Sequence, residues 1–179
     1  NYIPEVEQSG HYTLFRQRAE ENVRNWTRKP LVLRPQKGGF SDDEALIDAF
    51  LTHVAHGGST TYIIIYPYHA QIRMMIERLG MGQLFADWKR IVVGIAEKSS
   101  DRGGKVQVWD FSGVGPETLE PIPTRGDRET HLNYYWEAGH FKKELGNLVI
   151  DRLLGKQNNF GIKLDSGNIE SWLAEDRHR

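Results

Sequence analysis

The chain has 179 residues, of which 39% are hydrophobic and 11% aromatic, a composition typical of a folded domain rather than a disordered segment. Its 23 Lys and Arg residues nearly balance its 24 Asp and Glu residues, so the net charge of -1 gives no electrostatic footprint for nucleic acid or anionic lipid. Cysteine is absent, which excludes disulfides, thiolate metal sites and a cysteine nucleophile. The longest apolar run, around residues 62–66, is too short for a transmembrane helix, which needs roughly 20 residues.

The N-terminal part, residues 1–40, is predicted to be a helical and linker segment. Apolar residues recur at helical spacing from His11 to Trp26, and Pro30 ends that helix. Residues 31–33 predict a short strand, and residues 35–39 a loop. The segment begins Asn-Tyr-Ile-Pro, without an initiator Met or a signal-peptide pattern, so we expect the chain to be an excerpt of a longer protein.

The central part, residues 41–155, is predicted to hold the core. Ser41 and Glu44 have the spacing of a capping box, and the helix after them ends at Gly57-Gly58. Residues 60–66 predict a strand covered on both faces, because β-branched and aromatic residues follow one another there without alternation. A second strand is expected at 106–109, a long irregular segment at 112–135, and three further helices. The apolar faces of those helices are at 72–79, 84–95 and 141–153.

The tail, residues 156–179, predicts a strand at 160–164 and a helical turn or two at 166–173. The order of elements predicts an α/β fold, three-layered and built on a parallel sheet. Two convincing strands are few for such a sheet, which usually has about five or six. We therefore expect a single α/β domain, or the C-terminal part of one, with part of the sheet outside this chain.

Polar and aromatic clusters follow the predicted strands, where ligands gather in open α/β sheets. They are residues 66–69, residues 110–113 and residues 134–141. In the third cluster Glu137 and His140 are three residues apart at what reads as a loop-to-helix junction. Glu137 could accept the Nδ1 proton of His140 and leave Nε2 free as a general base. Alternatively, Glu137 caps the helix and His140 packs in its first turn.

Four segments of this chain, in this order, resemble the C-terminal half of bacterial SGNH/GDSL-like hydrolases, a group whose members are usually membrane-anchored. They are Tyr-Pro-Tyr-His-Ala (66–70), Trp-Asp-Phe-Ser-Gly (109–113), Glu-Pro-Ile-Pro (120–123) and Tyr-Trp-Glu-Ala-Gly-His-Phe-Lys (135–142). Glu137 and His140 match the C-terminal Asp-x-x-His pair of that family, with Glu in place of Asp. The resemblance covers roughly residues 40–155.

The resemblance implies a serine esterase or acyltransferase acting on acylated glycans or other polar esters, in an extracytoplasmic or periplasmic setting. It implies His140 as general base, Glu137 as its carboxylate partner and a substrate cleft lined by Tyr68, His69, Asp110 and Trp136. The nucleophilic Ser and the oxyanion-hole donors of the family lie upstream. We therefore expect a small-molecule or glycan ester as substrate and an N-terminal segment of the same gene product as partner. No cofactor is expected.

Each of these residues also has a structural interpretation. His69 could cap the helix that starts at Ala70, and Asp110 could cap a turn. Trp136 is as consistent with a core aromatic as with a sugar-stacking surface. His11 is expected to be exposed, and a metal site of His69, Asp110, Glu137 and His140 is disfavoured because zinc-type spacing is absent. The alternative function is a non-catalytic α/β module that binds a glycan or a protein.

Overall fold

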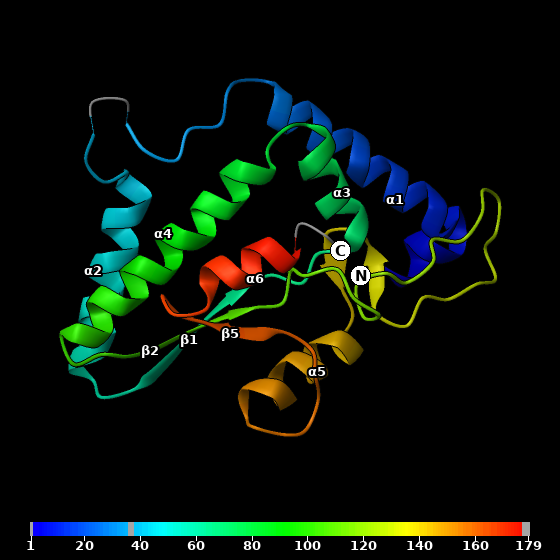
Figure 1. The fold of residues 1–179 in the computed structure, drawn as a ribbon. Helices are drawn as coiled ribbons and strands as arrows, with labels where there is room; N and C mark the ends of the chain where they lie inside the picture. Colours follow the sequence, from blue (N-terminus) through cyan, green and yellow to red (C-terminus); the bar gives the residue numbers. More distant parts are fainter. Residues whose placement is uncertain (1, 36–37, 177–179) are drawn as a thin grey trace. The chain divides into compact units, whose positions relative to one another are not determined.

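The structure is a computed structural model that describes residues 2–35 and 38–176, leaving aside the side chains of residues 55 and 56 (Figure 1). The chain mixes helix and strand, at 50% and 12% of its residues, and contains a small mixed sheet. It forms two compact units. Unit 1 consists of residues 1–30, 66–79 and 111–161, and unit 2 of residues 31–65, 80–110 and 162–179. The expected division at residues 40 and 155 stays a prediction.

Unit 2 contains a three-stranded sheet in the order β1-β2-β5. β1 (Thr60–Ile65) and β2 (Lys105–Asp110) are parallel, with Thr60 opposite Lys105. β5 (Ile162–Leu164) is antiparallel to β2, so the prediction of a parallel sheet is wrong at this strand. Three apolar-polar-apolar residues specify a strand, but they do not encode its direction.

The prediction that β1 is covered on both faces is also wrong. Tyr62 and Ile64 are 40% and 42% exposed, whereas Ile65 is buried. Within the described residues β1 is an edge strand with β2 as its partner. An unalternating apolar run therefore belongs here to a strand that is covered on one face.

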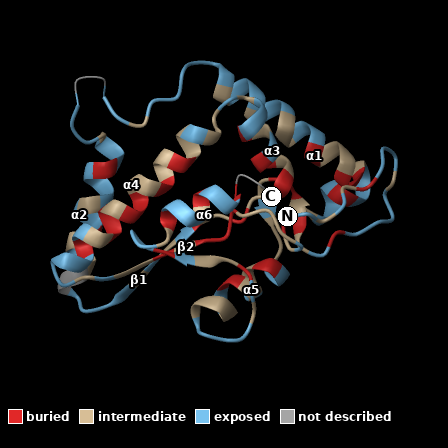
Figure 2. Ribbon diagram, in the orientation of Figure 1, coloured by how far each residue is buried: buried red, intermediate tan, exposed pale blue. Residues whose placement is uncertain are grey.

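Three helices complete unit 2: α2 (Asp42–His56), α4 (Gly82–Asp101) and α6 (Ile169–Asp176). The predicted capping box at the start of α2 is confirmed, since the Ser41 amide donates to Glu44 and the Glu44 amide to Ser41 Oγ. Buried residues recur along α4 at helical spacing, as Figure 2 shows, and pack with the sheet and α6. This core consists of Ile65, Ala86, Val92, Val93, Ala96, Val108, Leu164, Ile169 and Leu173.

Two other expectations for unit 2 differ from the structure. Residues 31–33 form no strand, and Val32 is 66% exposed, because β propensity alone does not provide a neighbouring strand. Leu46, Phe50 and Leu51 recur at helical spacing, which predicts that all three face the core, but only Leu51 is buried, at 1% exposed, whereas Leu46 and Phe50 are 71% and 60% exposed. Residues 36–37 of the predicted loop lie outside the described residues.

Unit 1 consists of α1 (Ile3–Thr27), α3 (Ala70–Arg78), a hairpin of β3 (Tyr135–Glu137) and β4 (His140–Phe141), and α5 (Lys143–Leu153). The predicted helix from His11 is confirmed as the long part of α1. A short helical piece precedes it, and the two meet at Gly10, where φ is 74°. A Cβ at Gly10 would lie 2.5 Å from the carbonyl oxygen of Asp127, so glycine allows this close approach of two backbones.

No helix in residues 2–35 and 38–176 is both long and apolar enough to cross a membrane.

Candidate functional site

The candidate site is the β3–β4 hairpin of unit 1. Tyr135 and Glu137 point inward and are 0% and 2% exposed, Trp136 between them is half-buried, and Ala138-Gly139 forms the turn. The expected loop-to-helix junction at Glu137 is therefore wrong, because α5 begins only at Lys143. Strands of two and three residues are too short for alternation to reveal them in the sequence.

The turn brings Glu137 and His140 into contact, as their spacing predicts. Glu137 Oε1 contacts Nδ1 of His140. Glu137 Oε2 accepts hydrogen bonds from the Gly139 amide at 2.8 Å and from Arg18 Nε at 3.0 Å. Both oxygens of this buried carboxylate are thus engaged, which offsets the cost of burying its charge.

His140 is held through one ring nitrogen. Its side chain is 47% exposed, and Nδ1 also lies 3.0 Å from the Tyr2 hydroxyl and 3.5 Å from Arg18 Nη2. A proton on Nδ1 directed at Glu137 leaves the lone pair on Nε2. Within the described residues, every hydrogen bond and ion pair of His140 involves Nδ1.

Helix α1 supports the hairpin with His11, Phe15 and Arg18, which share one helical face at spacings of four and three residues. His11 Nδ1 donates to the carbonyl of Trp136 at 2.9 Å, and His11 Nε2 accepts from the Leu132 amide at 3.4 Å. Arg18 reaches Glu137 two turns further along the helix. The hairpin is therefore fixed to α1 through both its backbone and its carboxylate.

The prediction that His11 is exposed is wrong, since it is 1% exposed. Burial lowers the pKa of His11, because a charged imidazolium would lose its hydration there, and both ring nitrogens already have backbone partners. His11 is a neutral structural histidine.

His69 is a second buried neutral histidine, 4% exposed, and burial lowers its pKa too. Its Nδ1 accepts from the Gln71 amide, so it caps α3, and its Nε2 donates to the carbonyl of Glu120 at 2.8 Å. The helix-cap interpretation of His69 thus describes its contacts. The amide of His69 also donates to the carbonyl of Ala138, which ties residues 66–69 to the hairpin turn.

Aromatic side chains surround the pair. Tyr2 is stacked on Trp136 with ring centres 6.1 Å apart, and the Lys142 ammonium lies 4.4 Å from the centre of the Trp136 ring. Tyr68 packs on Tyr66, which in turn packs on Phe141. Tyr68 and Trp136 are both half-buried.

Asp110 lies in unit 2, at the end of β2, where it is 0% exposed. Lys89 Nζ is 2.7 Å from Asp110 Oδ2 and 3.3 Å from Asp176 Oδ2, and the Trp172 indole donates to Asp110 at 2.8 Å. Asp110 is thus part of a buried ionic cluster that we call the Lys89 cluster (Lys89, Asp110 and Asp176). Tyr68, His69, Trp136, Glu137 and His140 all belong to unit 1.

Residues 2–35 and 38–176 contain no group of three or more His, Cys, Asp or Glu side chains that could hold a metal ion. Comparison of the chain with protein-family models, with curated proteins and with solved structures finds no match. The fold and the site define this chain as a mixed α and β protein in which a buried carboxylate contacts a half-exposed imidazole.

Sequence reasoning missed three residues of the site: Tyr2, His11 and Arg18. A signal was present, since polar residues with exact helical spacing flank the buried Phe15 on α1. Their hairpin partners lie more than a hundred positions further along the chain. Local pattern does not reveal contacts over such a separation.

Proposed function

We propose that this chain supplies the general base of an SGNH-type serine esterase or acyltransferase that acts on acylated glycans or other polar esters. His140 is the base and Glu137 its carboxylate partner. The observation that carries the proposal is the contact of Glu137 with Nδ1 of His140. It leaves Nε2 of this half-exposed imidazole free to accept a proton from the nucleophile.

The proposed proton path follows from this geometry. The nucleophilic serine comes from a segment upstream of this chain and gives its proton to Nε2 as its oxygen attacks the ester carbonyl. The Glu137 carboxylate then stabilises the imidazolium through Nδ1, and His140 returns the proton to the leaving alcohol. Arg18 and the Gly139 amide hold Glu137 in the orientation that this step needs.

The fold proposed with this function is a three-layer SGNH-like sheet with further strands next to β1. Two features of unit 2 support it: β1 and β2 are parallel, and β1 is an edge strand with Tyr62 and Ile64 exposed. Exposed apolar edge strands pair readily with another chain segment. We propose that an N-terminal segment of the same gene product pairs there, in an extracytoplasmic, membrane-anchored protein.

The test is the His140→Ala substitution in the complete gene product, measured as hydrolysis of p-nitrophenyl acetate. We expect turnover to fall by roughly 10²–10⁴-fold, the usual loss when a general base is removed. His131→Ala is the matched control, because His131 is an exposed histidine of the same unit. Turnover of His140→Ala within about twofold of wild type contradicts the assignment, because the loss of a general base lowers the rate far more than that.

A second candidate function is a non-catalytic glycan-binding module, which the Tyr2–Trp136 stack and the nearby Lys142 favour. Aromatic side chains and a cation gathered at one half-buried place offer contacts for the apolar face and the polar substituents of a sugar. The probe is an N-acetylglucosamine oligosaccharide, with binding followed by tryptophan fluorescence. Binding that is lost in Trp136→Ala and kept in His140→Ala, without ester turnover in either, favours the binding module.

A further inference from the structure

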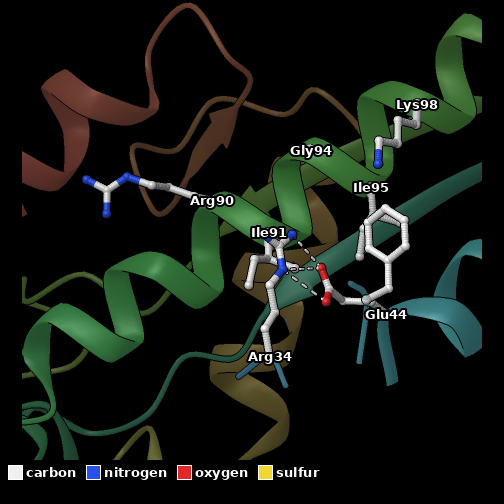
Figure 3. A pocket seen from close by; sticks show the side chains of 8 residues that line it. Arg34, Glu44, Arg90, Ile91, Gly94, Ile95 and Lys98 are labelled. Carbon is white, nitrogen blue, oxygen red and sulfur yellow. Dashed lines mark hydrogen bonds and ion pairs between the residues drawn. The ribbon is translucent and has the colours of Figure 1, made fainter. Parts of the chain in front are cut away.

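Unit 2 contains a pocket between α2 and α4 that the proposed function does not use. It has two adjoining parts of about 270 and 390 Å³, which share Phe40, Glu44, Ile95 and Lys98. Figure 3 shows the smaller part. The size is at the lower end of the range found for small-molecule sites, about 300–1,000 Å³. The remaining lining residues are Arg34, Arg90, Ile91 and Gly94 in one part, and Ala45, Asp48, Ala49 and Arg102 in the other.

The pocket exists because small residues face it from both helices. Ala45 and Ala49 line it on α2, and Gly94 lines it on α4. A Cβ added at Gly94 would meet no atom within 4 Å. A glycine inside a helix costs about 1 kcal/mol relative to alanine, so the sequence keeps this space open at a cost in helix stability.

Between the charged side chains, the walls of the pocket are apolar. Ile91 and Ile95 come from α4, and Phe40, which is 59% exposed, lines both parts of the pocket. A large aromatic side chain left this exposed beside a hollow is suited to contact with the apolar body of a ligand.

Three of the four cations that line the pocket are ion-paired. Arg34 pairs with Glu44 and Arg102 with Asp48. Arg90 points away from the pocket, as Figure 3 shows, and binds Glu170 at 2.7 Å.

Lys98 is the remaining cation of the lining. Its Nζ lies 4.3 Å from the centre of the Phe40 ring, and its charge helps to lower the pKa of Asp48, but no ion pair joins it to a carboxylate within residues 2–35 and 38–176. Lys98 is therefore the lining cation without an ion pair among the described residues, and it lies next to the exposed Phe40 ring.

We propose that this pocket binds a small amphiphilic anion, with an apolar body against Phe40, Ile95 and the open face of Gly94 and a single carboxylate at Lys98. The complementarity is twofold: the apolar walls match the body, and the ammonium of Lys98, which has no ion pair among the described residues, matches one negative charge. Arg34 and Arg102 already have carboxylate partners, so a second anionic group would meet Glu44 and Asp48 instead.

The test is a titration of the ¹⁵N-labelled chain with phenylbutyrate, followed by amide NMR shifts. We expect shifts concentrated at Phe40, Gly94 and Lys98, with a Kd of about 1 mM for a ligand of this size. Phenylbutanol, which has the same body and no charge, should bind about threefold more weakly, and phenylbutylamine more weakly still.

Two kinds of variant separate the walls from the charge. Gly94→Leu fills the pocket from α4 and should weaken both phenylbutyrate and phenylbutanol at least about tenfold, while a helical circular dichroism spectrum shows that α4 still forms. Ala49→Leu fills it independently from α2. Lys98→Gln should reduce phenylbutyrate binding about threefold, to the level of phenylbutanol, and leave phenylbutanol unchanged.

Lys105→Gln is the matched control, because Lys105 is an exposed lysine of unit 2 that does not line the pocket. The proposal is overturned if phenylbutyrate at about ten times the expected Kd shifts no pocket amide. It is equally overturned if the folded Gly94→Leu variant binds like wild type, or if phenylbutylamine binds as well as phenylbutyrate. None of these results depends on ester hydrolysis.

Discussion

The Lys89 cluster of unit 2 and the hairpin pair of unit 1 both place a nitrogen base against acidic side chains, with different consequences. In the Lys89 cluster the ammonium is 0% exposed and contacts two buried carboxylates. In the hairpin the carboxylate of Glu137 is buried, but half of the His140 side chain faces solvent. Both arrangements set a nitrogen against a buried carboxylate, and what differs is the access of water to that nitrogen. Because water reaches His140, the hairpin is suited to proton exchange. Because Lys89 is fully buried, its cluster is suited to structural support.

The largest effect that this comparison predicts is on the Lys89 cluster. Lys89→Met removes the ammonium that Asp110 and Asp176 both contact and leaves two negative charges buried near each other. We expect a loss of about 3–5 kcal/mol in the free energy of unfolding at pH 7, measured by urea denaturation. Lys105→Met, at an exposed position of β2, is the control. A loss below about 1 kcal/mol for Lys89→Met shows that water reaches this cluster as well.

The next effect concerns the two buried histidines of unit 1. The pKa values of His11 and His69 are lowered from 6.5 in the folded chain, so the unfolded chain takes up protons first as the pH falls. Their contribution to stability is complete above about pH 6.5 and is lost as the pH drops from there toward the folded pKa values. Each adds a slope of up to about 1.4 kcal/mol per pH unit.

Urea denaturation between about pH 7.5 and 5 measures this slope. His69→Asn keeps a residue that caps helices well but does not titrate, and should make the profile flatter by one proton. His131→Asn changes an exposed histidine and should leave the slope as in wild type. An unchanged slope in His69→Asn would mean that His69 binds its proton equally well in the folded and the unfolded chain, which contradicts this prediction.

The smallest effect is expected at His140 itself. His140→Ala should change the free energy of unfolding by less than about 1 kcal/mol, because the side chain is 47% exposed and Glu137 keeps Arg18 and the Gly139 amide. Thermal and urea denaturation of the isolated chain measure it. A loss as large as that of Lys89→Met means that the hairpin pair is structural, like the Lys89 cluster, and removes the contrast between the two units.

The parts of the fold that depend on nearby residues were predictable from the sequence. Apolar spacing located α3, α4 and α5, and the Ser41–Glu44 pattern located the start of α2. The contact of Glu137 with His140 follows from a spacing of three residues, although a hairpin rather than a helix brings them together. Each of these features involves residues within one or two helical turns of one another.

The parts that depend on distant residues were not predictable. Arg18 is 119 positions from Glu137, and nothing in the local sequence around Arg18 identifies its partner. The direction of β5 and the exposure of Tyr62 on β1 depend on which strands lie alongside, not on the residues of the strand itself. The burial of His11 has the same cause, because the groups that cover it are at Leu132 and Trp136.

The separation between α1 and the hairpin has a consequence during synthesis of the protein. His11 bonds to a residue 125 positions further along the chain. At a translation rate of about 5–20 residues per second, the ribosome makes Trp136 roughly 6–25 s after it makes His11. During that time Phe15, which is 1% exposed in the finished fold, lacks the hairpin that holds α1 in place. A ribosome-bound nascent chain that ends before residue 135 should therefore expose this helix face to chaperones and proteases, and a longer one should not.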